Sequence, residues 1–597
     1  FIEELVNSLL GMGVLKIEAG VCNLIGDLEQ IEMPDTVQRV VLARIDQLPE
    51  AQKVTLKVAS VIGRTFQRDL LHDVHPFANE ESVAEDLLRL QAEDFTRKDG
   101  RENELEFLFK HVITREVAYE TMLYSQRREL HATIGQAMES RARENEGEVV
   151  DLLAYHYALS DNRDKALIYL TRAGDKALLG NANEAAVSYF TQAVAVAEEL
   201  EKVDDQFNLI ARREQAYNRL GDRVAQGEDL DRMMDLAQAQ EKEGLRILQM
   251  LETESQRLLY LTNLGQYEDA IKVAEENLNI ARSTHLASWE ARILTNMGIT
   301  YWRAGDYEKA RQSMQKSLVL ATKVSDDKLK GTSYNYLGLI HTRLAEYPQA
   351  RRDYQQAMEI YQRTDDKAGE AGCANNFGLL EVSLGRYEQA RQHYEHALSL
   401  CQTLGDRLLE GISLNILGQV HTYLGQDGKA EAQLVKSLEV RQSIGDRRGE
   451  AFCLHDLGAL YMTRDKPEVA VEYFDAAVNL RASLGEKGNY NASLAAKGEA
   501  SLKANNLPVA THCLKEAIAE IDDSGSGEYP LQQVWWAYSQ LCQANSHFDE
   551  MKRALQIAYD LIQARVAQIS PTEYRRSYLE NVPVNAAIID AIQRSGS

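Results

Sequence analysis

Proline is scarce in this sequence, with nine residues among 597. Because proline breaks helices, its scarcity, together with abundant Ala, Leu, Glu, Gln and Arg, favours helix almost everywhere. At this length a single hydrophobic core is not expected. The chain should therefore contain several domains or an array of repeats.

Cysteine is also sparse, and the six cysteines lie far apart without a C-x-x-C pair. This spacing argues against a disulfide framework or a zinc site and favours a reducing cytosol. No apolar run is long enough to span a membrane, and no signal peptide opens the chain. We therefore expect a cytoplasmic protein without a membrane partner.

Positive charge is in deficit, since the formal net charge is −25. Such a balance is unfavourable for binding nucleic acid or an anionic membrane, so neither is an expected partner. The sequence also has no G-x-x-x-x-G-K-[ST] loop to hold the phosphates of a nucleotide. No Ser/His/Asp or Cys/His arrangement can be argued from the order of the residues. We expect no catalytic and no cofactor-binding residue in this chain.

Histidines were the remaining candidates for chemistry. His393-x-x-His396 could place two imidazoles on one face of a helix as metal ligands. No third ligand is nearby in the sequence, so we expect no metal site. For His111 and His131, a structural role is favoured over a catalytic one.

Glycine recurs at an unbroken spacing of 40 residues, at Gly298, Gly338, Gly378, Gly418, Gly458 and Gly498. Each glycine is followed by alanine after 12 residues, a bulky residue after 16 and a small residue after 19. Glycine and alanine allow two helices to cross closely. The bulky residues are expected to fill the gap to the next pair. The pattern predicts a helix hairpin that is repeated along the chain.

This pattern resembles the tetratricopeptide repeat, whose usual length is about 34 residues. Here each repeat is longer and includes a polar junction such as Leu404-Gly405-Asp406-Arg407. The 40-residue variant is similar to the repeats of spindle-orienting adaptors and of bacterial signalling ATPases. The resemblance implies an all-α superhelix. We assign degenerate helical repeats to 146–244, the regular array to 245–524, and a terminal hairpin with a capping helix to 525–597.

The first 145 residues do not follow the 40-residue spacing. A helix start at Met33 to Thr36 is followed by three stretches of apolar periodicity. A short polar hairpin at Arg97 to Glu104 then leads into a strand-like segment, Leu105 to Phe109. Three helices and a terminal β-wing predict a small winged-helix domain over 31–145.

Several segments resemble the end of the nucleotide-binding domain in signal-transduction ATPases of the STAND class, namely Phe1-Ile2-Glu3-Glu4-Leu5, Pro34-Asp35-Thr36-Val37, Ala43 to Pro49 and Ala59 to Gly63. The segment from Ile569 to Pro583 is similar to the carboxy terminus of bacterial members with an adenylate/guanylate cyclase domain, an ATPase and these repeats. The resemblance implies that 1–30 is the trailing helix of a truncated nucleotide-binding domain. It also implies that ATP is bound upstream of this chain, which itself needs no cofactor.

Three functional hypotheses follow. The first is a protein-interaction or sensor module of a larger nucleotide-regulated signalling protein, whose partner is a protein, a peptide or its own upstream nucleotide-binding domain. The second is the non-catalytic remainder of an adenylate/guanylate cyclase or ATPase in cyclic nucleotide signalling. A third and weaker hypothesis is a winged-helix transcriptional regulator. It is weaker because acidic residues match the basic residues of that region.

The concave face of the repeats is the predicted binding site. Asparagine recurs two and three residues before the repeat glycines, and arginine occurs five residues after two of them. Amides could bind the backbone of an extended peptide, and arginines could bind carboxylates. An alternative is that the asparagines bond to neighbouring helices or to water. The predicted partner-binding residues are Asn296, Arg303, Asn335, Arg343, Asn375, Asn376, Asn415, His455 and Asp456.

Overall fold

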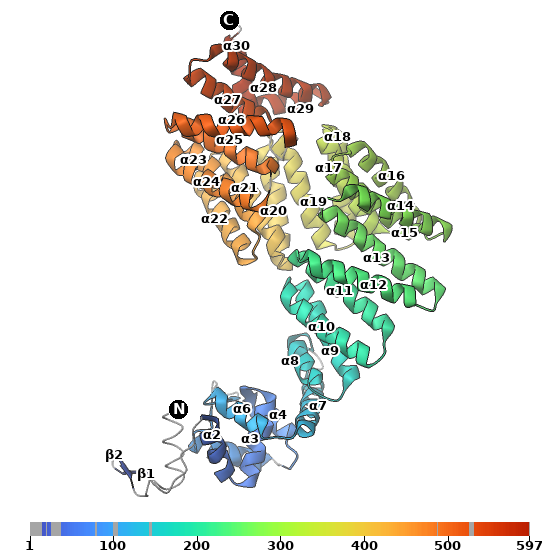
Figure 1. Ribbon diagram of the computed structural model, residues 1–597, viewed down its shortest axis with the longest axis vertical. Coiled ribbons are helices and arrows are strands. Elements are labelled where there is room, and N and C mark those ends of the chain that lie inside the picture. The colour runs from blue at the N-terminus through green and yellow to red at the C-terminus, as the bar shows by residue number, and fades with distance from the viewer. Residues whose placement is uncertain are drawn as a thin grey trace. The chain divides into compact units, whose positions relative to one another are not determined.

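The structure is a computed structural model, in which the chain forms two compact units, 1–236 and 237–597 (Figure 1). Each unit is described by itself. The described residues are 15–18, 21–24, 37–77, 80–98, 106–142, 146–485, 487–524 and 531–595.

The first unit begins with a two-stranded antiparallel hairpin. Strand β1 (Leu15–Glu18) pairs with β2 (Val21–Leu24). This corrects the trailing helix expected over 1–30 wherever that range is described. Strand β1 alternates apolar and polar residues, which is the period of a strand and not of a helix. The helix expected from Phe1 to Leu10 lies outside the described residues.

The next part combines short helices with a small sheet. The sheet is antiparallel, with strand order β3-β5-β4, and its central strand confirms the strand expected at 105–109. Leu56, Phe66 and Phe109 are buried in the common core. The winged-helix assignment over 31–145 stays a prediction. The elements are α2 (Val37–Gln47), α3 (Glu50–Ile62), β3 (Thr65–Gln67), α4 (Arg68–Val74), α5 (Glu80–Ala92), β4 (Thr96–Lys98), β5 (Glu106–Phe109), α6 (Val112–Glu120) and α7 (Tyr124–Arg141).

A buried histidine pair joins α7 to α8 (Glu146–Ala158). The Nδ1 atoms of His131 and His156 are 2.9 Å apart, and the Tyr119 hydroxyl lies 3.1 Å from Nε2 of His131. Burial lowers the pKa of His131 to about 4 and that of His156 to about 3. Both rings are therefore neutral near pH 7, and one Nδ1 donates to the other.

The helices that complete the first unit are α9 (Arg163–Leu179), α10 (Asn183–Glu199), α11 (Val203–Leu220) and α12 (Arg223–Ala239), with α12 running into the second unit. The pair α9–α10 repeats the glycine pattern of the array. A Cβ on Gly174 would lie 2.5 Å from the ring of Phe190, sixteen residues later. Ala186 and Ala193 occupy the two small positions and are buried. This pair is therefore more regular than the sequence alone indicated.

The second unit is a stack of helix pairs, which confirms the all-α superhelix of tetratricopeptide type (Figure 1). Each pair has a first and a second helix joined by a tight turn. The pairs are α13 (Glu243–Asn263) with α14 (Tyr267–Ser283), α15 (Ala287–Arg303) with α16 (Tyr307–Lys323), α17 (Asp327–Arg343) with α18 (Tyr347–Arg363), α19 (Lys367–Ser383) with α20 (Tyr387–Leu404), α21 (Arg407–Tyr423) with α22 (Asp427–Ser443), α23 (Arg447–Thr463) with α24 (Pro467–Leu484), and α25 (Lys487–Lys503) with α26 (Leu507–Ser524).

The bulky residue of each repeat packs on the glycine of its own pair. A Cβ on Gly338 would lie 2.5 Å from the ring of Tyr354, and the other repeat glycines are covered in the same way. The expectation that these residues only fill the gap to the next pair was therefore incomplete. Tyr354 does both, because its ring also stacks on Phe377 of the next pair, with the centroids 5.5 Å apart.

Four helices end the chain: α27 (Leu531–Ala544), α28 (Phe548–Gln568), α29 (Thr572–Glu580) and α30 (Pro583–Ser595). Helices α27 and α28 form the expected hairpin, and α30 packs on both of them. Trp535 and Trp536 contribute to the core of this hairpin. Among the described residues, no helix has the length and apolar character needed to cross a bilayer.

The histidine pair makes the first unit sensitive to acid. In the unfolded chain both imidazoles bind protons near pH 6.5, whereas in the folded unit they stay neutral down to about pH 4. As the pH falls below 6.5, the unfolded state takes up more protons and the free energy of unfolding decreases. At pH 5 the loss is about 2 kcal/mol for each histidine.

The four tryptophans all lie in the second unit. Unfolding of the first unit should therefore be seen by circular dichroism and not by tryptophan fluorescence. We expect the dichroism transition of the first unit to move to lower temperature between pH 7 and pH 5. His156→Gln should reduce this shift, and an equal shift in that variant would contradict the assignment.

Candidate partner-binding surface

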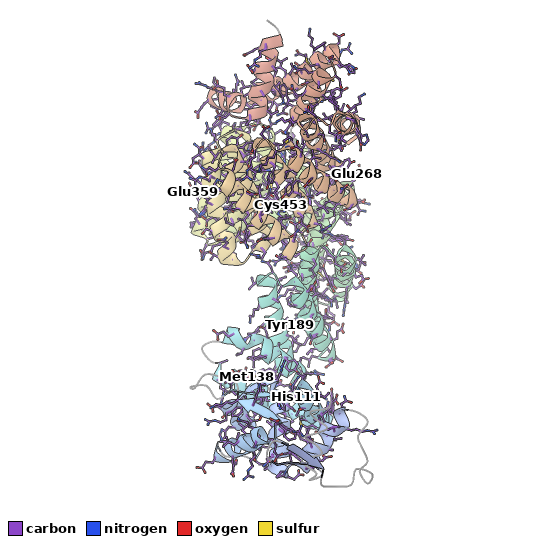
Figure 2. The ribbon with its side chains drawn as sticks, turned by 90° about the vertical axis from the view of Figure 1, so that its left-hand side faces the viewer. His111, Met138, Tyr189, Glu268, Glu359 and Cys453 are labelled. Atoms are coloured by element: carbon purple, nitrogen blue, oxygen red, sulfur yellow. The ribbon has the colours of Figure 1, made fainter. Side chains whose placement is uncertain are left out.

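The first helix of each pair lies on the inside of the curved stack. Within the described residues, successive first helices contact one another along the array, whereas successive second helices barely touch. Elements on the inside of a curve are closer together, so the second helices form the outside. In Figure 2, Glu359 on the second helix α18 lies at the edge of the second unit, whereas Cys453 on the first helix α23 is buried within it.

Side-chain hydrogen bonds join the first helices of neighbouring pairs, and the predicted asparagines make them. The Asn376 amide donates to Oδ1 of Asn335 at 3.0 Å. One pair further on, the Ser413 hydroxyl donates to Oδ1 of Asn375 at 3.0 Å. The Asn415 amide donates to Oδ2 of Asp456 at 2.5 Å. These partners are 38 to 41 residues apart, about one repeat. We call this set of contacts the amide ladder.

Asp456 contributes a buried carboxylate to the ladder. Burial raises the pKa of its carboxyl to about 6, although the bonds donated by Gln419 and Asn415 act in the opposite direction. The Gln419 amide donates to Oδ1 of Asp456 at 2.7 Å. Beside it, Nδ1 of His455 lies 3.0 Å from the Ser493 hydroxyl, and burial lowers the pKa of His455 well below its usual value. Both side chains therefore serve the contact between helices.

The structure corrects the role assigned to the buried members of the predicted site. Less than a tenth of each of these residues is exposed, so an extended peptide could not reach their polar atoms, namely those of Asn296, Asn375, Asn415, His455 and Asp456. Burying an amide or a carboxylate costs free energy unless it is hydrogen-bonded. The neighbouring helix supplies a bond to Asn375, Asn415, His455 and Asp456. For Asn375, Asn415, His455 and Asp456, the contacts match the alternative in which these residues bond to neighbouring helices.

The remaining predicted residues are more open. Asn335 and Asn376 are half-buried, and Arg303 and Arg343 are exposed. The Arg303 guanidinium donates to Oδ1 of Asn263, at 2.5 Å, and so belongs to the same inter-helix series. Of the predicted residues, Arg343 and Asn376 are therefore the best placed to contact a partner.

Sequence reasoning missed the side chains that lie further along the same face of the first helices. Positions one and five residues after the repeat glycine are one and two helical turns beyond the ladder. They carry Leu379, which is 38% exposed, Gln419, and Tyr423, which is 50% exposed. Tyr336, two residues before its glycine, is half-buried on this face. We call Tyr336, Asn376, Leu379, Gln419 and Tyr423 the inner face. Of the position five residues after the glycine, only the arginines entered the predicted site. Reading it in every repeat, together with the position one residue after the glycine, would have found Leu379, Gln419 and Tyr423.

Tyr423 is an aromatic side chain of the inner face that is partly packed and partly open to solvent. Half of the residue is exposed, yet desolvation by the surrounding protein raises its pKa to about 12. Its ring stacks on Tyr387, with the centroids 4.5 Å apart. Because Tyr423 lies on a first helix, it is on the concave side of the stack, where a bound chain would displace water from apolar surface.

The two histidines of the His393-x-x-His396 pair have different partners. His393 stacks on Phe377 with the ring centroids 4.1 Å apart, and burial lowers its pKa to about 4. His396 places Nε2 2.8 Å from Oε1 of Glu370. Within the described residues, no group of three or more His, Cys, Asp or Glu side chains is arranged to hold a metal ion.

The array matches the family model described as tetratricopeptide repeat, over residues 253–323, 329–403, 370–443 and 408–483. These residues are thus tetratricopeptide repeats, which are non-catalytic modules that bind other proteins on extended concave surfaces. No curated protein sequence matches the chain.

Solved structures of repeat proteins resemble the chain at low identity. One is a STAND protein with a tetratricopeptide repeat sensor from Pyrococcus horikoshii, with 14% identity over 91% of this chain and 68% of that chain and a TM-score of 0.40. Another is a Rap protein complexed with competence and sporulation factor, with 12% identity over 58% and 98% of the two chains and a TM-score of 0.40. A third is the quorum sensor NprR from B. thuringiensis, with 16% identity over 58% and 99% and a TM-score of 0.43.

The amide ladder should contribute to stability. Asn415→Ala leaves the buried Asp456 carboxylate with one donor fewer, so we expect the free energy of unfolding of the second unit to fall by about 1–3 kcal/mol. Leu379→Ala, on the exposed inner face, should change it by less than about 1 kcal/mol. Urea unfolding followed by tryptophan fluorescence measures both. Equal stabilities of the two variants would contradict the buried role of Asn415.

Proposed function

We propose that the second unit binds an extended segment of a protein partner on its inner face. The observation that carries this proposal is the exposure of Leu379 and Tyr423 on the concave side of a repeat array. Apolar side chains that are open in a concavity of a protein lose unfavourable contact with water when a partner covers them. Most large apolar side chains of the array are instead buried between helices.

The polar groups of the inner face suit the backbone of the bound segment. The amides of Asn376 and Gln419 lie three and four residues before Leu379 and Tyr423 on the same helices. Each donates one bond within the array, and an amide has a second N–H and a carbonyl oxygen that suit a peptide group. Arg343, at the end of α17, would meet a carboxylate of the partner. In this arrangement the amides fix the course of the segment, and the apolar side chains provide most of the affinity.

We further propose that the chain is the sensor part of a larger, nucleotide-regulated signalling protein. The support is the likeness of segments near both ends of the sequence to STAND-class ATPases. In that setting the bound segment belongs either to a separate protein or to the nucleotide-binding domain itself. The nucleotide is held by that domain, and this chain needs no cofactor.

A calorimetric titration tests whether this chain itself binds nucleotide. We expect no heat of binding when ATP with Mg²⁺ is titrated into this chain, because no phosphate loop is present in its sequence. Micromolar affinity would contradict the proposal. The titration uses the whole chain with both units, so neither unit has to fold in isolation.

A displayed library of unstructured peptides tests binding to the inner face. Peptides selected on the native chain should lose at least about tenfold in affinity on Leu379→Arg, which corresponds to about 1.4 kcal/mol. The matched control is Val319→Arg, because Val319 is 69% exposed on the second helix α16, on the outside of the stack. Equal losses in both variants, or a library without binders, would contradict the proposal.

A further inference from the structure

The end of the chain contacts repeats that lie about 200 residues earlier in the sequence. The segment from Arg565 to Val582, which spans the end of α28 and all of α29, packs on the α17–α18 and α19–α20 turns. Figure 1 shows α29 near α18 at one end of the second unit. We call this segment the C-terminal clasp. It does not simply cover the last repeat, as a capping helix would.

Polar groups of the clasp bind backbone carbonyls at the ends of two first helices. The Arg565 guanidinium donates to the carbonyl oxygens of Arg343 at 2.7 Å and of Thr342 at 3.1 Å. The Ser577 hydroxyl donates to the carbonyl oxygen of Leu384 at 2.5 Å. The last carbonyls of a helix lack partners within the helix, so the clasp satisfies the carbonyls of Arg343 and Leu384 and adds a second bond to that of Thr342, which also accepts from the Ala345 N–H.

Apolar and charged contacts extend the same interface. Ile569 is fully buried in the core that contains Tyr347 and Leu384. The ring of Tyr574 meets Tyr347 edge-on at 6.3 Å, and the Arg386 guanidinium lies 4.5 Å from the Tyr574 centroid. Arg386 also pairs with Glu573. The hydrophobic core of the middle repeats therefore continues into the clasp.

Gly385 marks the closest approach. A Cβ at this position would lie 2.6 Å from Cβ of Asn581 and 3.0 Å from its backbone carbon. Gly425 occupies the same place in the next pair and has the same φ of +67°, but a Cβ there would meet nothing within 4 Å. The two glycines thus differ in their contact with the clasp and not in backbone conformation.

The clasp connects α17 and α19 to α28 and α29. The helix pairs that lie between these helices along the chain are therefore kept at one curvature. The inner-face residues Leu379 and Tyr423 lie on α19 and α21, within the span that the clasp closes. Arg565 holds the same last turn of α17 from which Arg343 projects. An interface of this mixed polar and apolar kind, between distant parts of one chain, can open locally at a lower free energy than global unfolding.

We propose that the C-terminal clasp opens and closes, and that its closed state restricts the access of large partners to the inner face. The proposal rests on the proposed function, in that it takes the inner face to be the binding surface. Its test does not require a bound peptide, so the two can fail separately.

The opening variant is Gly385→Ala, and the matched control is Gly425→Ala. Both place alanine at a φ of +67°, so both carry the same backbone strain, but only the first displaces Asn581. Circular dichroism should show the same helix content in both. Amide exchange in α29 should be about tenfold faster in Gly385→Ala than in Gly425→Ala, the ratio expected when about 1.4 kcal/mol is removed from the closed state.

Access to the inner face is measured by adding Leu379→Cys to both variants. A maleimide carrying a bulky polyethylene glycol should react about tenfold faster in the Gly385→Ala background, in proportion to the open population. Iodoacetamide, which is small, should react equally in both because Leu379 is already partly exposed. The same chains without Leu379→Cys correct for the native cysteines.

Each result decides the proposal. Faster exchange of α29 together with faster reaction of the bulky reagent supports it. Equal reaction of the bulky reagent, despite faster exchange of α29, would show that the clasp is a structural contact that does not restrict access. Equal exchange of α29 in both variants would show that the clasp does not open at Gly385, and this too overturns the proposal.

Discussion

The distance between the two helices of a pair is set by a glycine on the first helix and a bulky side chain on the second, sixteen residues later. A Cβ on Gly338 would overlap the Tyr354 ring, so the helices could not keep their present separation. The pair α13–α14 reaches a similar fit with the sizes reversed, because buried Leu258 and Ala274 occupy the glycine and bulky positions. What the array requires is thus a fixed combined volume at the crossing.

The contacts between pairs depend on a second constraint, the need to satisfy buried polar groups. At the same two positions of the repeat, the amide ladder uses different residue types. Asn376 bonds to Asn335, and Asp456 bonds to Asn415. Each bond joins neighbouring first helices and so fixes their relative rotation. Because the ladder uses these groups for packing, the proposed binding falls mainly on the next turns of the same helices, where Leu379 and Tyr423 are open.

The proposed binding surface and the clasp involve the same repeats. The first helices α17, α19 and α21 carry the inner face, and the turns of α17–α18 and α19–α20 hold the clasp. A change in curvature would alter the spacing of Leu379 and Tyr423 and the fit of Ile569 together. Under the proposed opening of the clasp, a partner bound on the inner face acts on the end of the chain without touching it, because both depend on the curvature of the array.

The sequence by itself determined the helix pairs, their turns and the all-α class. The contact that defines each pair joins two residues only sixteen positions apart, and this contact recurs every 40 residues. It also located the recurrent asparagines, and the strand Glu106–Phe109 followed from a local apolar run. Only the tertiary structure decided that Asn375 and Asn415 are buried, since their burial depends on a helix one repeat away. It alone placed Ile569 and Ser577 on the middle repeats, because contacts across about 200 residues depend on the accumulated curvature of the stack and leave no periodic trace in the sequence.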